Sequence, residues 1–237
     1  GIVELPGGPV VGGTFTDLTE GTSRFSQFIQ IEDGEGNWEL SGLDAGGDIF
    51  FSLSHTGSVT VLDSVLSGPY DVLRVVYPAA VTIENSVLIA EGALVDAWVS
   101  GRALQVQSNS YAAVSITGSQ LTGPTVITGE VDLTVVGSVL AHCTPGDPAN
   151  PVLHVVPGAG GIQIHNSVLY GQDSVVNGTP AVRLDLNAGD GSTAVLQNNN
   201  FLGGSVDASA LDGGLIRNNA FYAPAGPSLW TSASIAP

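Results

Sequence analysis

The sequence predicts an all-β protein: a single-stranded right-handed parallel β-helix of about nine coils with capped ends. Composition supports an ordered β domain, because 43% of the 237 residues are hydrophobic and only 11% are charged. The 32 glycines indicate many turns. Above all, a ten-residue pattern recurs along the chain, and recurrence at intervals of about 20 to 50 residues is typical of solenoids.

Seven copies of this pattern align without gaps: VTVLDSVLSG (59–68), VTIENSVLIA (81–90), VSITGSQLTG (114–123), LTVVGSVLAH (133–142), IQIHNSVLYG (162–171), AVLQNNNFLG (194–203) and GLIRNNAFYA (214–223). The third and eighth positions are always aliphatic or phenylalanine, so both are expected to face the core. The second and fourth positions are mixed, as expected for the outward side of a strand with period two. Each copy therefore predicts a half-buried strand followed by a second strand.

A sharp corner is expected between the two strands. The fifth position holds only residues that tolerate a left-handed backbone: Asp63, Asn85, Gly118, Gly137, Asn166, Asn198 and Asn218. The sixth position holds small polar residues able to hydrogen-bond a turn or to stack on their equivalents in the next coil: Ser64, Ser86, Ser119, Ser138, Ser167, Asn199 and Asn219.

The corners lie 19 to 33 residues apart, so each coil is expected to keep this corner and to carry insertions elsewhere. Two further strand-like runs, 28–31 and 48–53, precede the first copy and raise the estimate to about nine coils. We predict one domain over residues 1–237. Residues 1–47 would form an N-terminal cap and first coil, 48–223 the coils, and 224–237 a C-terminal tail or cap.

With these columns, the repeat resembles that of the right-handed parallel β-helix superfamily, which includes pectate lyases, polygalacturonases, phage tailspikes and bacterial adhesins. The resemblance covers residues 59–223. It implies the fold and leaves the activity open, because one architecture hosts many functions.

Charge narrows the range of partners. The net charge is −17, from 22 acidic residues against five arginines and no lysine. Nucleic acid is not an expected partner, since binding it requires a basic face. No membrane insertion is expected either, because no apolar run of 18 residues occurs. The acidic composition fits an extracellular or cell-surface protein.

The repeat columns predict no catalytic residue. For a lyase, the resemblance implies a basic residue beside a calcium-bound uronate, but Arg217 and the nearest carboxylate of its column, Glu84, are five coils apart. Glu84 and His165 are three coils apart, about 14 Å at the spacing of parallel strands. If the protein is a polysaccharide lyase or hydrolase, its carboxylates are expected on the loops, at Asp71, Asp96, Asp173 or Asp185.

Two acidic turns are candidate calcium sites, because Ca²⁺ prefers oxygen ligands. One would use Asp33, Glu35 and Asn37, and the other Asp185, Asn187 and Asp190. Ordinary acidic turns explain both segments as well, so no cofactor is required.

A candidate binding surface lies near the C-terminal end. The ninth position of the last three copies holds Tyr170, Leu202 and Tyr222, which would form a row on successive coils. Exposed aromatic rings on a rigid sheet can stack on sugars or anchor a partner protein. A loop or the tail covering the row is the alternative that we favour.

These observations favour a non-catalytic secreted or cell-surface module with a structural, adhesive or carbohydrate- or protein-binding role. The alternatives are a polysaccharide lyase or glycoside hydrolase of the pectate-lyase-like superfamily and a tailspike-like fibre segment.

Overall fold

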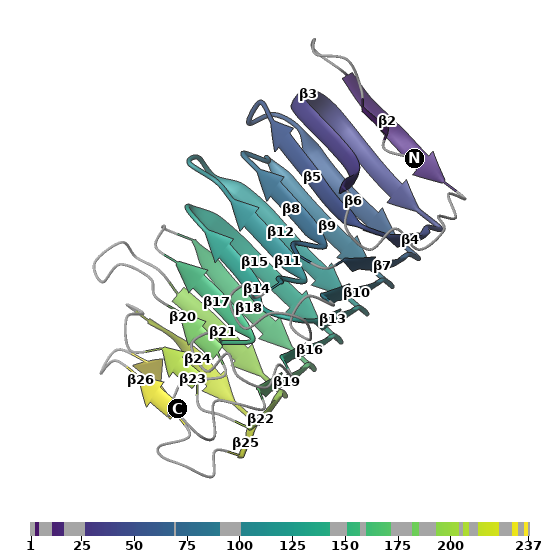
Figure 1. The fold of residues 1–237 in the computed structure, drawn as a ribbon. Helices are drawn as coiled ribbons and strands as arrows, with labels where there is room; N and C mark the ends of the chain where they lie inside the picture. Colours follow the sequence, from purple (N-terminus) through teal and green to yellow (C-terminus); the bar gives the residue numbers. More distant parts are fainter. Residues whose placement is uncertain are drawn as a thin grey trace.

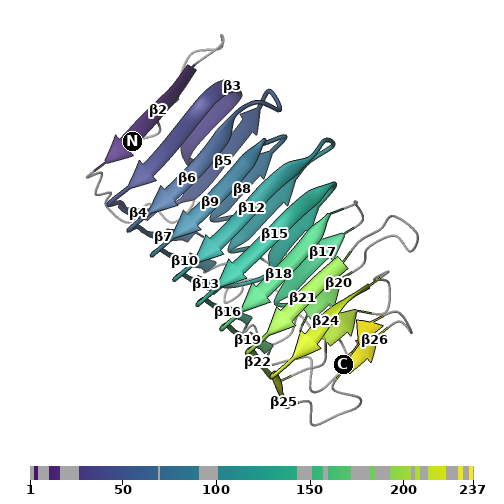
Figure 2. The ribbon, with the colours of Figure 1, turned by 180° about the vertical axis from the view of Figure 1, so that it is seen from behind.

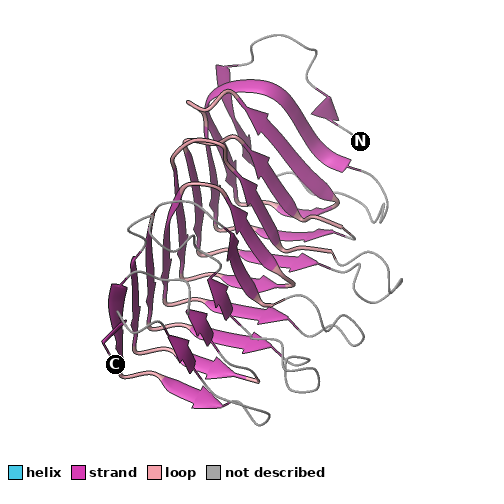
Figure 3. Cartoon of the chain, turned by 90° about the vertical axis from the view of Figure 1, so that its left-hand side faces the viewer, coloured by secondary structure: helices cyan, strands magenta, loops and turns pink. Residues whose placement is uncertain are grey.

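The computed structural model describes residues 3–4, 11–16, 27–68, 70–90, 101–142, 151–156, 160–171, 182–184, 193–203, 206–208, 213–222, 229–231 and 235–236. Over these residues every regular element is a β-strand, and every strand pairing is parallel (Figures 1 and 3). The prediction of an all-β fold with parallel strands is therefore confirmed. The strands stack from one end of the molecule to the other, with the two termini at opposite ends (Figure 1).

The strands fall into three ladders, in which each strand generally pairs with the strand three places further along the chain. The first ladder contains β1 (Val3–Glu4), the beginning of β3 (Gln27–Ser41), β5 (Asp48–Leu53), β8 (Leu73–Val76), β11 (Leu104–Gln107), β14 (Thr125–Thr128), β17 (Leu153–Val156), β20 (Val182–Leu184), β23 (Val206–Ala208) and β26 (Leu229–Thr231).

The second ladder contains β2 (Val11–Thr16), the end of β3, β6 (Ser58–Leu62), β9 (Ala80–Glu84), β12 (Ala112–Thr117), β15 (Val131–Val136), β18 (Gly161–His165), β21 (Thr193–Gln197), β24 (Gly213–Arg217) and β27 (Ile235–Ala236). Because the long strand β3 belongs to both ladders, they form one sheet of 19 strands. In Figure 2, which is turned by 180° from Figure 1, the strands of the second ladder face the viewer.

The third ladder is a separate sheet of eight strands. It contains β4 (Asp44–Gly46), β7 (Val65–Gly68), β10 (Val87–Ala90), β13 (Gln120–Thr122), β16 (Val139–His142), β19 (Val168–Gly171), β22 (Asn200–Leu202) and β25 (Ala220–Tyr222). The ten-residue repeat supplies the second and third ladders, while the first ladder comes from the segments between copies.

The core follows the predicted columns. Third-position side chains from Val61 to Ile216 are buried, and eighth-position side chains are buried from Leu66 to Phe201. In the last copy, Phe221 is half-buried and stacks on Phe201 with ring centroids 5.1 Å apart. Second- and fourth-position side chains remain partly or fully exposed wherever the structure describes them. The alternation of a pleated strand therefore places the apolar columns inside.

The predicted corner is confirmed at all seven positions. Each fifth-position residue has a positive φ, between 47° and 58°, whether it is Asp, Asn or Gly. The connection from the second ladder to the third is always two residues long, whereas the other connections vary in length. This corner is the invariant part of each repeat, as the sequence spacing indicates.

Sixth-position side chains link neighbouring repeats, as predicted. The backbone N–H of Ser119 donates to Ser138 Oγ (3.2 Å), and the N–H of Ser138 donates to Ser167 Oγ (3.2 Å). Each serine hydroxyl also donates to the carbonyl oxygen two residues before it, as Ser138 does to Val136 (2.9 Å). Asn199 and Asn219 continue the series through their Oδ1 atoms. These buried backbone groups are thereby satisfied at the corner, where ladder hydrogen bonds are interrupted.

The structure contains an eighth copy that the sequence pattern did not reveal. Residues 38–47 occupy the same register as 59–68, with Trp38 paired to Val59 and Leu40 to Val61. Gly42 forms the corner with a φ of 64°. Because Leu43 replaces the usual serine and Ala45 the usual leucine, the match is weak in sequence. Trp38 is consequently part of the core, packed against Phe51 with ring centroids 5.9 Å apart.

Candidate functional site

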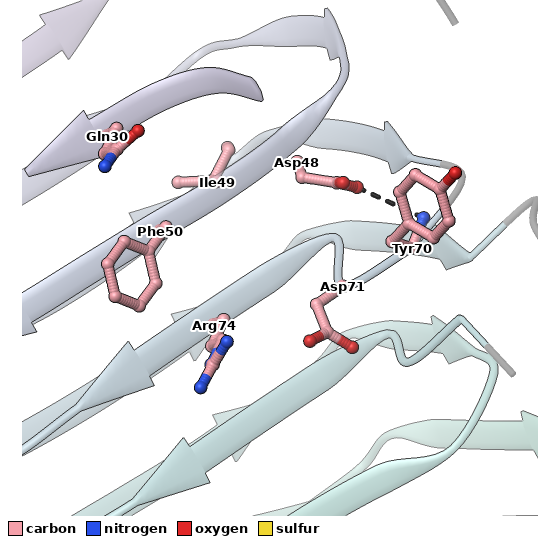
Figure 4. A pocket seen from close by; sticks show the side chains of 7 residues that line it. All are labelled: Gln30, Asp48, Ile49, Phe50, Tyr70, Asp71 and Arg74. Carbon is pink, nitrogen blue, oxygen red and sulfur yellow. Dashed lines mark hydrogen bonds between the residues drawn. The ribbon is translucent and has the colours of Figure 1, made fainter. Parts of the chain in front are cut away.

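A pocket of about 270 Å³ lies on the outer side of the first ladder, near the N-terminal end (Figure 4). It spans strands β3, β5 and β8 and the turn that precedes β8. Its lining combines two carboxylates, one guanidinium, one amide and two aromatic rings: Gln30, Asp48, Ile49, Phe50, Tyr70, Asp71 and Arg74. The pocket is small and mostly polar, and it places these charged, polar and aromatic groups around one concave surface.

The floor of the pocket is set by strand register. Gln30, Phe50 and Arg74 are direct partners on three neighbouring strands. Strand alternation points them outward, since Ile29, Ile49 and Leu73 beside them are buried in the core. The Arg74 guanidinium carbon lies 5.3 Å from the centre of the Phe50 ring, within the range of a cation–π contact. The parallel strands thus fix the spacing of these side chains.

The carboxylates lie at one end of the pocket, beside Tyr70 (Figure 4). Asp48, at the start of β5, accepts a hydrogen bond from the backbone N–H of Tyr70 (3.2 Å). Asp71 precedes β8, the next strand of the first ladder, and forms a long ion pair with Arg102 (3.8 Å). The Tyr70 side chain is 44% exposed, so much of its surface is available to a ligand.

Burial raises the pKa of Asp48 from 3.8 to about 6; the Tyr70 N–H opposes this shift and the neighbouring Asp71 carboxylate adds to it. Burial also raises the pKa of Asp71, although the Arg102 and Arg74 guanidiniums and a backbone hydrogen bond from Arg102 act in the opposite direction. For Asp71, desolvation therefore outweighs the ion pair, in keeping with the length of that pair. Two carboxylates with raised pKa values in one pocket are a feature of functional sites.

Gly68 provides room for the Asp48 carboxylate. A Cβ atom at position 68 would lie 2.8 Å from Asp48 Oδ1 and 3.1 Å from the Gly47 carbonyl oxygen. Any larger residue would displace the carboxylate from the backbone N–H that holds it.

The predicted row of large side chains is brought together. Tyr170 pairs with Leu202, and Leu202 with Tyr222, on β19, β22 and β25. Tyr170 and Leu202 are half-buried, while Tyr222 is 65% exposed. Most of the loop and tail residues that would form the favoured cover lie outside the described part of the structure, so the cover stays a prediction.

The candidate calcium residues are described only in part. Glu35 and Asn37 are exposed on β3, and Asn37 Oδ1 accepts a hydrogen bond from Ser58 Oγ (2.6 Å). The Asp33 side chain lies outside the described part of the structure, as do Asp185, Asn187 and Asp190. Among the described residues, no three Asp, Glu, His or Cys side chains are grouped as metal ligands would be.

The candidate catalytic residues of the repeat columns stay apart. Register places Glu84 three strands from His165 and five from Arg217, whose guanidinium donates to Gln197 Oε1 (3.0 Å). Of the four candidate loop carboxylates, Asp71 is in the pocket, while Asp96, Asp173 and Asp185 lie outside the described residues. Sequence reasoning missed Asp48 as its partner. The signal available was the strand-like run 48–53, whose outward positions carry Asp48 and Phe50.

No family model, curated protein or solved structure matches the chain. Within the described residues, the structure has no helix with the length and apolar character needed to cross a membrane.

Proposed function

We propose that the chain is a right-handed parallel β-helix of about nine coils that serves as a non-catalytic, secreted or cell-surface module for binding carbohydrate. The three-strand period supports the coil, with the strand pairs β1–β2 and β26–β27 at the two ends of the stack. Right-handedness is supported by the strong preference of parallel strand crossovers for that hand. The acidic, lysine-free composition supports an extracellular location.

The observation that carries the binding role is the exposed Tyr70 ring beside the Asp48 and Asp71 carboxylates in one pocket. A sugar offers C–H groups that stack on an aromatic face and hydroxyls that donate to carboxylates. The volume of about 270 Å³ lies just below the usual range of ligand sites, so one sugar unit fits better than an extended chain segment. Because the lining is built on strands, little ordering is required on binding.

A glycoside hydrolase is the second candidate, favoured by the same two carboxylates. Such enzymes use one protonated and one ionised carboxyl group on either side of the scissile bond. Asp48, with a pKa of about 6, would be the acid. Asp71, held by Arg102, would be the ionised partner.

The test is a glycan-array screen and a depolymerisation screen of the purified protein, each with calcium and with chelator. We expect binding without release of reducing or unsaturated ends, and loss of that binding in Tyr70→Ala. Tyr222→Ala is the matched control, because it removes an exposed tyrosine at the other end of the molecule. Release of reducing ends that stops in Asp48→Asn would instead establish the hydrolase.

Binding that survives Tyr70→Ala and disappears in Tyr222→Ala would move the site to the Tyr170, Leu202 and Tyr222 row. No binding and no cleavage would refute both candidates. A trimeric mass in solution would then favour a tailspike-like fibre segment.

A further inference from the structure

The two carboxylates of the pocket differ in how far arginine side chains neutralise their charge. Arg102 forms its ion pair with Asp71, and Arg74 also acts on Asp71 while lying over the Phe50 ring. Among the described residues, Asp48 has no ion pair, and its carboxylate is held by the backbone N–H of Tyr70. A negative group is thus presented next to an exposed aromatic ring, while the two nearby arginines act on Asp71 and on the Phe50 ring.

This arrangement suits a ligand with a positive charge. An ammonium group between Asp48 and the Tyr70 ring would gain a charge-assisted hydrogen bond from the carboxylate and a cation–π contact from the ring. A uronate would bring a carboxylate towards Asp48 and Asp71 and would be repelled. A neutral sugar would leave the Asp48 charge partly desolvated and without a counter-charge.

On the basis of the proposed carbohydrate-binding role, we propose that the pocket selects a sugar bearing a free amino group, as in a 2-amino-2-deoxyhexose. Asp48 would accept from the ammonium, and the remaining polar lining, Gln30 and Asp71, would accept from or donate to hydroxyls. Tyr70 would stack on the ring of the sugar. The specificity then arises from one carboxylate that the protein leaves without a cation.

The pH dependence of binding follows from the same geometry. The titratable and charged groups that face the site are Asp48, Asp71, Tyr70, Arg74 and Arg102. Binding requires ionised Asp48, whose pKa is about 6. Affinity is therefore expected to be severalfold weaker at pH 5 than at pH 7, since most Asp48 is protonated at the lower pH, while partial loss of the ligand's own ammonium proton near pH 7 limits the gain.

The experiment is calorimetric titration of the whole chain with the β-1,4-linked disaccharide of glucosamine, its N,N′-diacetylated form and digalacturonate. We expect binding of the amino disaccharide and binding at least about tenfold weaker for the other two. Asp48→Asn should lose about tenfold or more of the affinity. Asp44→Asn is the control, because it removes an exposed carboxylate outside the pocket and reduces the net negative charge by the same amount.

The outcomes separate the two proposals. Equal binding of the acetylated disaccharide, or a flat pH profile, would overturn the amino-sugar inference and leave the carbohydrate-binding proposal standing. Binding of none of the sugars here or on the array would overturn both. Equal losses in Asp48→Asn and Asp44→Asn, or equal binding of a lysine oligomer, would show general attraction to an acidic protein and overturn the inference.

Discussion

Each corner between the second and third ladders holds one residue in the left-handed region of backbone conformation. Residues as different as Asp63 and Gly137 have nearly the same φ there. The conformation therefore belongs to the two-residue connection between the ladders and does not depend on one residue type. Aspartate, asparagine and glycine are selected because they tolerate it at low cost. At the neighbouring position, the buried serine hydroxyl accepts from one coil and donates within its own, so a methyl group cannot replace it.

Gly137 isolates the backbone contribution at a corner. Its φ is 58°, and a Cβ there would have no atom within 4 Å, so steric contacts do not complicate a substitution. We expect Gly137→Ala to lower the free energy of unfolding by about 1 kcal/mol through backbone strain. Gly137→Asn should cost less, as measured by urea unfolding of both variants. Equal losses for the two variants would show that the side-chain preference at this corner has another cause.

Asp48 gives a pH-dependent contribution to stability. Its folded-state pKa of about 6 lies above the unfolded value of 3.8, so the folded protein binds the proton more tightly. This contribution is fully present below about pH 4 and is lost as the pH rises through about 6. Since Asp48 is partly solvated, we expect a change of about 1 to 2 kcal/mol.

The measurement compares urea unfolding of the wild type and Asp48→Asn at pH 5 and pH 7. The wild type should lose more stability than the variant between these values. Asp71, whose pKa is also raised, contributes in the same direction in both proteins. A variant with the same pH profile as the wild type would contradict the raised pKa.

Among the elements, the second and third ladders were predictable and the first was not. The constant two-residue corner keeps the spacing between β9 and β10, and between β15 and β16, the same, so their repeat positions align without gaps in the sequence. Strands of the first ladder, such as β8 and β14, follow connections of variable length. These four-residue strands mix apolar and polar residues, so nothing in the sequence fixes how they align with one another. The pocket was missed for this reason, since Gln30, Phe50 and Arg74 align only in three dimensions.

The constant corner predicts where insertions are tolerated. One alanine inserted between Ser138 and Val139 would shift β16 by one residue and move Leu140 out of the core. We expect a loss of about 2 kcal/mol or more in the free energy of unfolding. The same insertion after Gly92, in the connection between β10 and β11, should cost less than about 0.6 kcal/mol. Urea unfolding of both insertions measures the difference, and similar costs would contradict a privileged corner.

At the scale of the whole molecule, charge opposes association. The chain carries a net charge of −17 at pH 7 and has a sequence pI of about 4.1. Stacked parallel strands end in edges with unpaired backbone groups, which can add further strands when repulsion is removed. The strong negative charge is therefore expected to keep the strand edges of separate molecules apart.

We expect the protein to be dispersed at pH 7 and to self-associate as the pH approaches 4, where the net charge nears zero. Light scattering across this range, with circular dichroism to follow the β content, measures the transition. Association that leaves the β spectrum intact would indicate contact between folded molecules. Unchanged scattering at pH 4 would contradict the role of charge.

The hydrogen bonds between sixth-position residues of successive repeats all run in the same direction along the chain, and this direction bears on folding during synthesis. The backbone N–H of each sixth-position residue donates to the sixth-position side chain of the next repeat in the sequence. The series runs from Leu43, which donates to Ser64, to Asn199, which donates to Asn219. Leu43 donates without offering a side-chain acceptor, so it is a natural starting point. During synthesis from the N-terminus, every newly emerged repeat would supply the acceptor for the unpaired sixth-position N–H of the repeat before it. Growth of the folded structure can therefore keep pace with translation, one repeat at a time.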